Sequence, residues 1–276
     1  LFFTQKGKCF WMRVYEIPEG SKNSKGRAMQ NLINIEQDDR VKAFICTQDL
    51  KDEEYVNSNY VIMATKMGQV KKTSLEQYSR PRSNGINAIT IKDGDELLEA
   101  KLTNGNSQIM LAVKSGKAIR FEESKTRPMG RNASGVRGIR LKDNKDEVVG
   151  MISVNDMDAN ILVVSENGFG KRSSLEDYRL TNRGGKGVKT ISITEKTGKL
   201  VTLKSVSDND DLMIINKSGI AIRMQVEDLR VMGRATQGVK VISLKDGDSI
   251  AAVAKVMKDD DDLEDVNDIE FTGDTV

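Results

Sequence analysis

A short apolar segment followed by a glycine occurs five times in this chain, and this repetition constrains the fold more than any other feature. The glycines are spaced by 61, 48, 52 and 51 residues and are Gly7, Gly68, Gly116, Gly168 and Gly219. The longer first step contains a polar insert, 49–59, which we interpret as a surface loop. A period of about 50 residues indicates that each copy forms one structural unit that packs on its neighbours.

Every copy predicts four short β-strands. In the fourth copy, 161–164 and 169–175 flank the glycine turn and predict a hairpin whose second strand has a charged, outward-facing pattern. The alternation in 188–193 predicts a third strand, and in the second copy an Asp-rich turn, 93–95, leads to a fourth strand at 97–100. A second glycine precedes each third strand, 17 to 19 residues after the first, and these glycines are Gly26, Gly85, Gly135, Gly187 and Gly238.

Four strands per copy are typical of a propeller blade, because radial repetition keeps the edges of each sheet short and protected. We therefore expect one all-β domain over 1–258, a closed or nearly closed ring of four-stranded antiparallel blades. The repeats are expected at about 1–50, 60–106, 108–158, 160–210 and 211–257.

Each copy also carries a polar loop with cations just before its second glycine. In four of the five copies a Lys or Arg stands four residues before that glycine. For any single loop a solvated face is the better explanation, but the recurrence favours a continuous positive band that binds phosphates without recognising bases. Cations of the second strands should widen this band. The candidate DNA-binding residues are Lys22, Lys25, Arg27, Lys71, Lys72, Arg80, Arg82, Arg120, Arg127, Arg131, Arg137, Lys171, Arg172, Arg179, Arg183, Lys186, Lys189, Arg223, Arg230, Arg234 and Lys240.

The charge of the chain is unevenly distributed. The net charge is +2, from 43 basic and 41 acidic residues, but 259–276 contains nine acidic residues and no basic one. Residues 1–258 therefore carry 43 basic and 32 acidic residues, a net charge of +11, which suits a polyanionic partner. We expect 259–276 to be a disordered, solubilising tail, and a second hypothesis is that it competes with DNA for the basic surface.

Several classes of function are disfavoured. The chain has no histidine, which removes the commonest general base and metal ligand, so neither catalysis nor a bound cofactor is expected in this domain. Its two cysteines, Cys9 and Cys46, are interpreted as inert core thiols. No apolar run approaches the ~20 residues of a membrane helix, and the start of the chain lacks the anatomy of a signal peptide. We expect a cytoplasmic protein without a membrane partner.

Aromatic residues do not favour the binding of single strands. They make up 5% of the chain, and Tyr78 and Tyr178 both stand ten residues after a turn glycine, where other copies have Ile17 and Leu229. This position is typical of core packing. Since stacking platforms for bases are not apparent, duplex DNA is the expected partner.

Three segments carry a specific resemblance to a known family. They are Phe10 to Pro18 with Lys25-Gly26-Arg27, Val70 to Thr73, and Met129 to Leu141. The first has the sequence FWMRVYEIP and the last MGRNASGVRGIRL. On these residues the chain, from Leu1 to about Lys258, resembles the C-terminal domain of the DNA gyrase A protein.

This resemblance implies a β-pinwheel, a propeller-like disc whose neighbouring blades exchange strands, with DNA wrapped around its basic rim in a positive hand. In the family, the wrap delivers a neighbouring duplex segment for ATP-driven strand passage, which introduces negative supercoils. The expected partners are duplex DNA, the rest of the gyrase A protein and the gyrase B protein. The catalytic tyrosine, ATP and Mg²⁺ are expected elsewhere in the holoenzyme. Bending 20–30 bp by 40–90° costs about 1–6 kcal/mol, which many phosphate contacts can offset.

Two features depart from the family. Its Gln-Arg-Arg-Gly-Gly-Lys-Gly box belongs to the first blade, whereas here Arg183 to Gly187 keeps the last five residues of the box in the fourth repeat. Family members have six blades, and five repeats are visible here. A first blade with its box preceding Leu1 would explain both departures. The alternative is a natural five-bladed ring, as in the protein of topoisomerase IV that selects DNA segments for decatenation.

Two other functions fit the expected ring less well. A protein-interaction propeller of the WD-repeat kind would not need recurrent cations, and the copies lack a Trp-Asp signature. A propeller enzyme acting on sugars or small molecules would need a carboxylate pair or a metal site, and neither is visible.

Overall fold

The structure, a computed structural model, describes residues 1–20 and 26–257. The expected acidic tail, 259–276, and the candidate cations Lys22 and Lys25 lie outside the described residues. The described part contains one α-helix, α1 (Glu53–Ser58), and five 3-10 turns, namely η1 (Val14–Glu16), η2 (Met29–Asn31), η3 (Leu75–Tyr78), η4 (Glu123–Lys125) and η5 (Leu175–Asp177). All other regular structure is β-strand, so the prediction of an all-β fold is confirmed.

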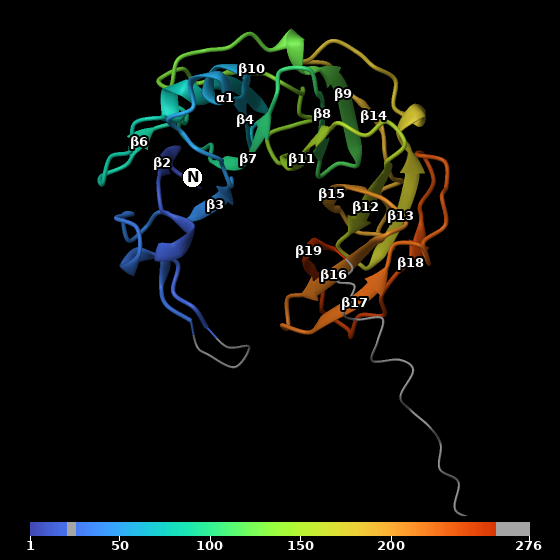
Figure 1. Cartoon of the computed structure of the whole chain (residues 1–276). Coiled ribbons are helices and arrows are strands. Elements are labelled where there is room, and N and C mark those ends of the chain that lie inside the picture. Colours follow the sequence, from blue (N-terminus) through green and yellow to red (C-terminus); the bar gives the residue numbers. More distant parts are fainter. Residues whose placement is uncertain (21–25, 258–276) are drawn as a thin grey trace, which may run out of the picture.

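The strands form five antiparallel sheets, which we call blades 1 to 5 (Figure 1). Blade 1 has the order β3-β1-β2-β6, with β1 (Phe2–Thr4), β2 (Lys8–Phe10), β3 (Val41–Phe44) and β6 (Ile86–Asn87). Blade 2 has the order β10-β5-β4-β7, with β4 (Tyr60–Thr65), β5 (Gln69–Ser74), β7 (Leu97–Thr103) and β10 (Val136–Arg137). Blade 3 has the order β11-β8-β9-β14, with β8 (Gln108–Val113), β9 (Lys117–Glu122), β11 (Val148–Val154) and β14 (Val188–Lys189).

Blade 4 has the order β15-β12-β13-β18, with β12 (Asn160–Ser165), β13 (Phe169–Ser174), β15 (Leu200–Val206) and β18 (Val239–Lys240). Blade 5 has three strands in the order β17-β16-β19, with β16 (Asp210–Asn216), β17 (Ala221–Gln225) and β19 (Ile250–Met257).

Neighbouring blades exchange their outermost strands. The two-residue strands β6, β10, β14 and β18 each come from one repeat and pair with the hairpin of the repeat before it. In blade 3, for example, Val188 pairs with Ala118 and Lys189 with Lys117. The exchange implied by the family resemblance is therefore present. The third strands are shorter than predicted, because only the first two residues of each alternating segment enter the ladder.

The blades follow one another around a ring that is open between blades 1 and 5, and we call this shape the arc (Figure 1). Of the closed or nearly closed ring that we expected, the closed form is therefore not seen in the described residues. Strands β7, β11, β15 and β19 face the centre of the arc, and blades 1 and 5 lie at its two ends. The physical reason is the exchange itself. The outer strand of each of blades 1 to 4 comes from the following repeat, and among the described residues no repeat follows the fifth to complete β17.

The hydrophobic cores lie between blades, which explains why the central strands are apolar throughout. In β4, Val61 and Met63 pack in one core with blade 1, whereas Ile62 and Ala64 pack in the next core with Ile109 of blade 3. Strands β8 and β12 alternate in the same way. Because successive side chains point to opposite faces of a sheet, a strand between two blades must be apolar on both faces. The predicted packing of Tyr78 and Tyr178 is confirmed, since both are fully buried.

The Asp-rich turn before the fourth strand of a repeat accepts hydrogen bonds from the hairpin turn of the same blade. In blade 3, the Asp146 carboxylate accepts hydrogen bonds from the Ser115 backbone N–H at 2.9 Å and from the Ser115 hydroxyl at 2.8 Å. Asp95 accepts from the Met67 N–H at 2.9 Å in the same way in blade 2. The carboxylate satisfies a backbone donor that the hairpin leaves free, so these turns have a structural role.

Two local expectations were wrong. The insert 49–59 is not only a loop, because it forms α1, whose first turn is capped by Asp52 and whose Val56 is buried. Cys9 is buried as expected, but Cys46 is exposed. None of the helices in the described residues is long and apolar enough to cross a membrane.

Candidate nucleic-acid interface

The polar loops predicted from the repeats lie along the outer edge of the arc, and we call 80–85, 127–135, 179–187 and 230–238 the rim loops. The last three are each placed by the blade of the preceding repeat. Met129 N–H donates to the Lys72 carbonyl at 2.8 Å, Thr181 N–H to the Arg120 carbonyl at 2.9 Å, and Met232 N–H to the Arg172 carbonyl at 2.8 Å. The loops therefore occupy equivalent positions on three successive blades.

Each of these loops also bonds to the outer strand beside it. Asn87 of β6 donates its side-chain N–H to the Asn132 side chain at 3.1 Å. Arg183 donates to the Arg137 carbonyl of β10 at 3.1 Å, and Arg234 donates to the Lys189 carbonyl of β14 at 2.8 Å. Rim loops and outer strands thus form one continuous belt, which we call the basic rim.

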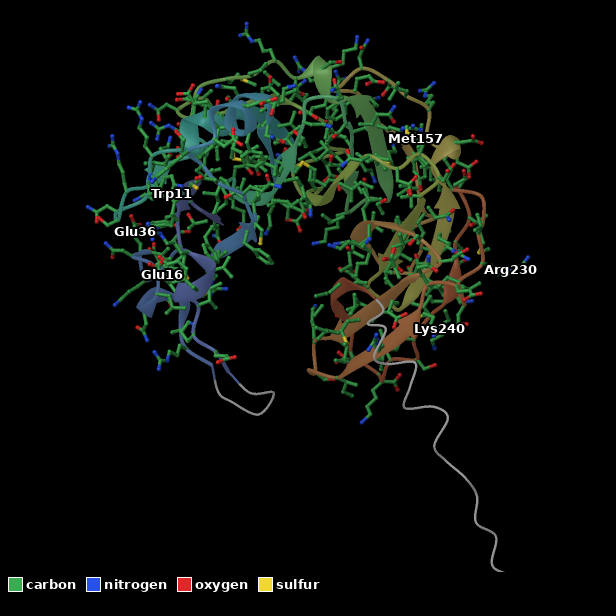
Figure 2. All side chains as sticks on the ribbon, viewed as in Figure 1. Trp11, Glu16, Glu36, Met157, Arg230 and Lys240 are labelled. Carbon is green, nitrogen blue, oxygen red and sulfur yellow. The ribbon has the colours of Figure 1, made fainter. Side chains whose placement is uncertain are left out.

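Most of the predicted cations are exposed along this outer edge. Figure 2 shows Arg230, for example, directed away from the centre of the arc. Only Arg223 among the exposed candidates forms an ion pair within the described residues, with Asp211 at 2.7 Å. The exposed candidates are Arg27, Arg80, Arg82, Arg127, Arg137, Arg179, Lys186, Lys189, Arg223, Arg230 and Lys240. The half-buried candidates are Arg120, Arg131, Arg183 and Arg234.

Four candidates are not on the surface, and their expected contribution to the band is corrected. Lys71 and Lys171 are fully buried, and Lys72 and Arg172 are 4% and 7% exposed. In blades 2 and 4 the second strand of the hairpin is covered by the central strand, the exchanged strand and the next rim loop, so its cations face protein instead of solvent. Free phosphates cannot reach these four side chains in the folded chain.

The buried lysines hold the rim loops from beneath. Lys71 Nζ donates to the backbone carbonyls of Ala88 and Arg131, both at 2.5 Å. Lys171 Nζ donates to the Gly233 carbonyl at 2.6 Å and to the Thr236 hydroxyl at 3.2 Å. Both lysines are the third residue after a hairpin glycine, in blades 2 and 4. They position the loops that carry Arg131 and Arg234, although they do not themselves reach solvent.

In blades 1 to 4, the fourth residue after the hairpin glycine joins one blade to the next. The Trp11 indole N–H donates to the Tyr78 carbonyl at 2.9 Å, and an Arg120 guanidinium N–H donates to the Tyr178 carbonyl at 3.0 Å. At the same position, Arg172 donates to the Leu229 carbonyl. From the sequence we assigned these arginines to DNA binding. Trp11, an uncharged donor at the same position of the repeat, was the available sign that this position bonds to the neighbouring blade.

Lys72 is also the fourth residue after a hairpin glycine, and it forms a buried ion pair. Its Nζ lies 3.6 Å from the carboxylate of Glu123, which is fully buried. Glu123 also accepts hydrogen bonds from Thr103 at 2.7 Å and from the Ser107 N–H at 3.2 Å. A buried charge is tolerated when it is paired and hydrogen-bonded, so Lys72 and Glu123 are structural.

The buried lysines predict a pH-dependent stability. Burial lowers the pKa of Lys71 to about 7 and that of Lys171 to about 8, from an ordinary value of 10.5. Between these values and 10.5 the unfolded chain binds more protons than the folded chain, so the free energy of unfolding should rise with pH. Urea denaturation from about pH 6.5 to 9.5 measures this rise.

The matched variants are Lys71→Met with Lys171→Met, and Lys92→Met as an exposed control. We expect the double variant to lose most of the rise in unfolding free energy and the control to keep it. A rise of equal size in all three proteins would show that neither buried lysine titrates in this range.

The sequence matches the family described as DNA gyrase C-terminal domain, beta-propeller, over residues 1–48, 59–104, 108–155, 159–207 and 210–266. The DNA gyrase A protein of Staphylococcus epidermidis is 44% identical over 262 residues, and the DNA gyrase A protein of Staphylococcus aureus is 44% identical over 264 residues. Each alignment covers 95% of this chain and 29% of the relative. The chain therefore spans less than a third of the length of these relatives.

Two solved structures have the same fold. A C-terminal domain of DNA topoisomerase IV matches with a TM-score of 0.83 at 25% identity, covering 93% of this chain and 78% of that chain. A DNA gyrase A C-terminal domain matches with a TM-score of 0.78 at 25% identity, covering 93% of this chain and 81% of that chain. The matched family segments follow the five-fold repetition, and together with these relatives they show that the chain belongs to the DNA gyrase C-terminal domain family.

Proposed function

We propose that this chain binds duplex DNA along the basic rim, without recognising base sequence, and bends the duplex around the arc. The observation that supports this most is the continuity of the rim, in which hydrogen bonds join rim loops and outer strands from β6 to the loop 230–238. Along this belt, successive blades carry exposed cations that have no carboxylate partner among residues 1–20 and 26–257. Such a surface suits the regularly spaced phosphates of a duplex.

The energetics favour wrapping over recognition. Each phosphate that is neutralised releases condensed counterions, so a rim with many contacts gains affinity that depends steeply on salt. That gain can offset a bending cost of about 1–6 kcal/mol per 20–30 bp. Side chains on a convex edge contact the backbone of the duplex, and we propose no contact that would distinguish bases.

In the complete protein, we propose that this chain supplies the wrapping surface of a gyrase A protein. Strand cleavage, ATP and Mg²⁺ would belong to the rest of the gyrase A protein and to the gyrase B protein, and the chain itself would need no cofactor. The gyrase A relatives are bacterial, which supports a bacterial cytoplasmic setting. The wrap would support ATP-dependent negative supercoiling.

A topology assay tests wrapping directly. The chain is mixed with a nicked circle, ligase seals the nick, and the protein is removed before the topoisomers are resolved on a gel. We expect a positive change in linking number that grows with the protein-to-DNA ratio, because a right-handed wrap stores positive supercoils. Gel shift of a linear duplex of about 150 bp at two salt concentrations measures binding in the same preparation.

A second candidate is the DNA-selecting domain of topoisomerase IV, favoured by the TM-score of 0.83 with that enzyme's C-terminal domain and by the five blades. This candidate predicts binding without a change in linking number. Binding with no change would therefore exclude wrapping and favour this candidate, whereas absence of binding would exclude both.

A further inference from the structure

A basic hollow opens beside the rim at the hairpin end of blade 3. Its inner part has a volume of about 180 Å³ and is lined by four cations, Lys117, Arg140, Lys142 and Lys186. An outer part of about 490 Å³ continues past Lys189 and Lys145. None of these six cations forms an ion pair with a carboxylate of the described residues. The lining contains two acidic residues, Asp143 and Asp146, so the positive charge of the hollow is only partly compensated.

The acidic group in the inner hollow does not neutralise these cations. Asp146 is buried, and its two oxygens accept hydrogen bonds from the Ser115 N–H, the Ser115 hydroxyl and the Lys142 N–H. The carboxylate is therefore committed to holding the hairpin turn. It keeps its negative charge, so the inner part of the hollow is lined by four positive charges and one negative charge.

Two of the cations directly oppose each other in the sheet. Lys117 of β9 and Lys189 of β14 are register partners, so their side chains project from the same face of blade 3. The corresponding pairs in the other blades are Lys8 with Asn87, Gln69 with Arg137 and Phe169 with Lys240. Like charges at directly opposite positions are destabilising, and blade 3 alone among these four has such a pair.

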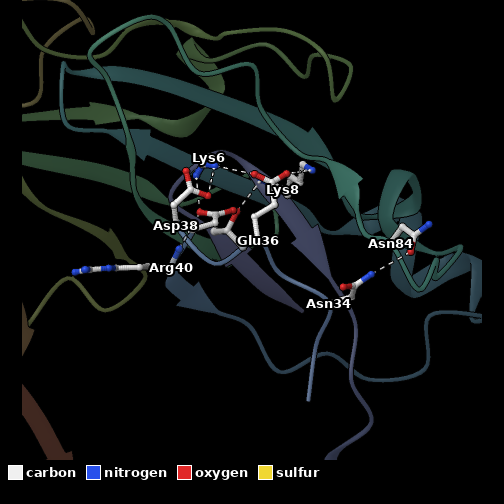
Figure 3. Close-up of polar contacts among 9 residues, drawn as sticks. Lys6, Lys8, Asn34, Glu36, Asp38, Arg40 and Asn84 are labelled. Carbon is white, nitrogen blue, oxygen red and sulfur yellow. Dashed lines mark hydrogen bonds and ion pairs between the residues drawn. The ribbon is translucent and has the colours of Figure 1, made fainter. Parts of the chain in front are cut away.

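In blade 1, the position that corresponds to Lys117 is neutralised by carboxylates of the chain itself. Lys8, which like Lys117 directly follows the hairpin glycine, lies 2.9 Å from a Glu36 carboxylate oxygen (Figure 3). Lys6 lies 2.7 Å from Glu36 and 2.6 Å from Asp38 (Figure 3). Blade 3 has the cations without such carboxylates, so a phosphate-bearing ligand would supply the missing negative charge.

We propose that this hollow is a phosphate-binding pocket that takes the backbone of the duplex held on the basic rim. The inference rests on the proposed function, and it adds that the duplex leaves the outer edge and crosses onto this face at the junction of blade 3 with the rim loop 179–187. Lys186 belongs both to the rim loop 179–187 and to the hollow, so the two surfaces are continuous. The junction becomes a strong point of attachment along the wrap.

The test compares two double variants that remove equal charge. The hollow variant, Lys117→Gln with Lys142→Gln, removes two of the cationic side chains that line the hollow. Lys92→Gln with Lys245→Gln removes the cations that correspond to Lys142 in the Asp-rich turns of blades 2 and 5, and both are without carboxylate partners in the part of the chain that the structure describes. Duplex affinity is measured by fluorescence anisotropy over a range of salt, and thermal melting of the free proteins is measured in parallel.

The hollow variant should bind duplex about tenfold or more weakly at about 100 mM salt, with a salt slope lower by about 1 to 2, while the control stays close to wild type. It should also melt at a slightly higher temperature than wild type, because it loses the opposed Lys117 and Lys189 charges. A structural role for Lys117 would predict the opposite change in melting temperature.

Three distinguishable results would overturn either this proposal or the proposed function on which it rests. Equal salt slopes in the two double variants, with a wild-type chain that binds, would overturn the pocket alone. Loss of pyrophosphate binding in the hollow variant, measured by calorimetry without loss of duplex affinity, would show that the pocket serves a free phosphate compound. A wild-type chain that fails to bind duplex would instead refute the proposed function.

Discussion

Replacing Arg127, Arg179 and Arg230 together by glutamine should weaken duplex binding by about 100-fold or more at about 100 mM salt. Each of these arginines is the first residue of a rim loop, eleven residues after the hairpin glycine of its repeat. All three are exposed, and in the described part of the chain none donates a hydrogen bond or forms an ion pair. They occupy one position on three successive blades, so they should contact phosphates at regular intervals along the wrap.

The magnitude follows from counterion release, since each lost phosphate contact lowers the salt slope by about 0.9 and three contacts lower it by about 3. The control removes three exposed lysines away from the rim, Lys51, Lys217 and Lys245, by the same change to glutamine. Because both variants lose equal net charge, a general attraction to DNA would weaken binding equally in both. Such an equal loss would contradict the assignment of the rim.

Much of the fold could be predicted because the determining signals are local and recur. The apolar segment, the glycine turn and the charged segment after it define each hairpin without knowledge of its neighbours. What local signals could not show is where a third strand goes. Val188 and Lys189 alternate like any strand, but they complete the sheet of the preceding repeat, and only the packing of the blades decides this. Local signals also could not decide whether the ring closes, and we expected a closed or nearly closed one.

The site was predicted less completely, for a physical reason. A cation that grips phosphate and a cation that bonds a backbone carbonyl use the same N–H donors, so Lys71 and Arg127 could not be distinguished by residue type. Their positions in the repeat do distinguish them. In blades 2 and 4 the third and fourth residues after the hairpin glycine lie within a covered strand. Arg127, Arg179 and Arg230, at the eleventh position of their repeats, lie in exposed loops. Trp11 at the fourth position was the one sign that this place serves packing.

Gly187→Ala should lower the free energy of unfolding by about 3 kcal/mol or more. This is the largest effect that we expect from a substitution that removes neither a charge nor a hydrogen bond. Gly187 has φ of +70°, and a Cβ built on it would lie 2.5 Å from the Ala118 carbonyl oxygen. Gly135 and Gly238 have the same conformation, with a Cβ position 2.5 Å from the Val70 carbonyl oxygen and 2.6 Å from that of Gly170. Urea denaturation of the variant measures the change.

The reason lies in strand exchange. Each of these glycines stands directly before an exchanged strand, where the incoming backbone meets the second strand of the preceding blade. A methyl group there clashes with backbone, which cannot move without displacing β14 from β9. Gly233→Ala is the matched control, because Gly233 also lies in a rim loop but a Cβ there would meet nothing within 4 Å. If both variants unfolded at the same urea concentration as wild type, the close approach at Gly187 would not be what fixes the exchanged strand, and the blades would have to be joined chiefly by their shared apolar cores.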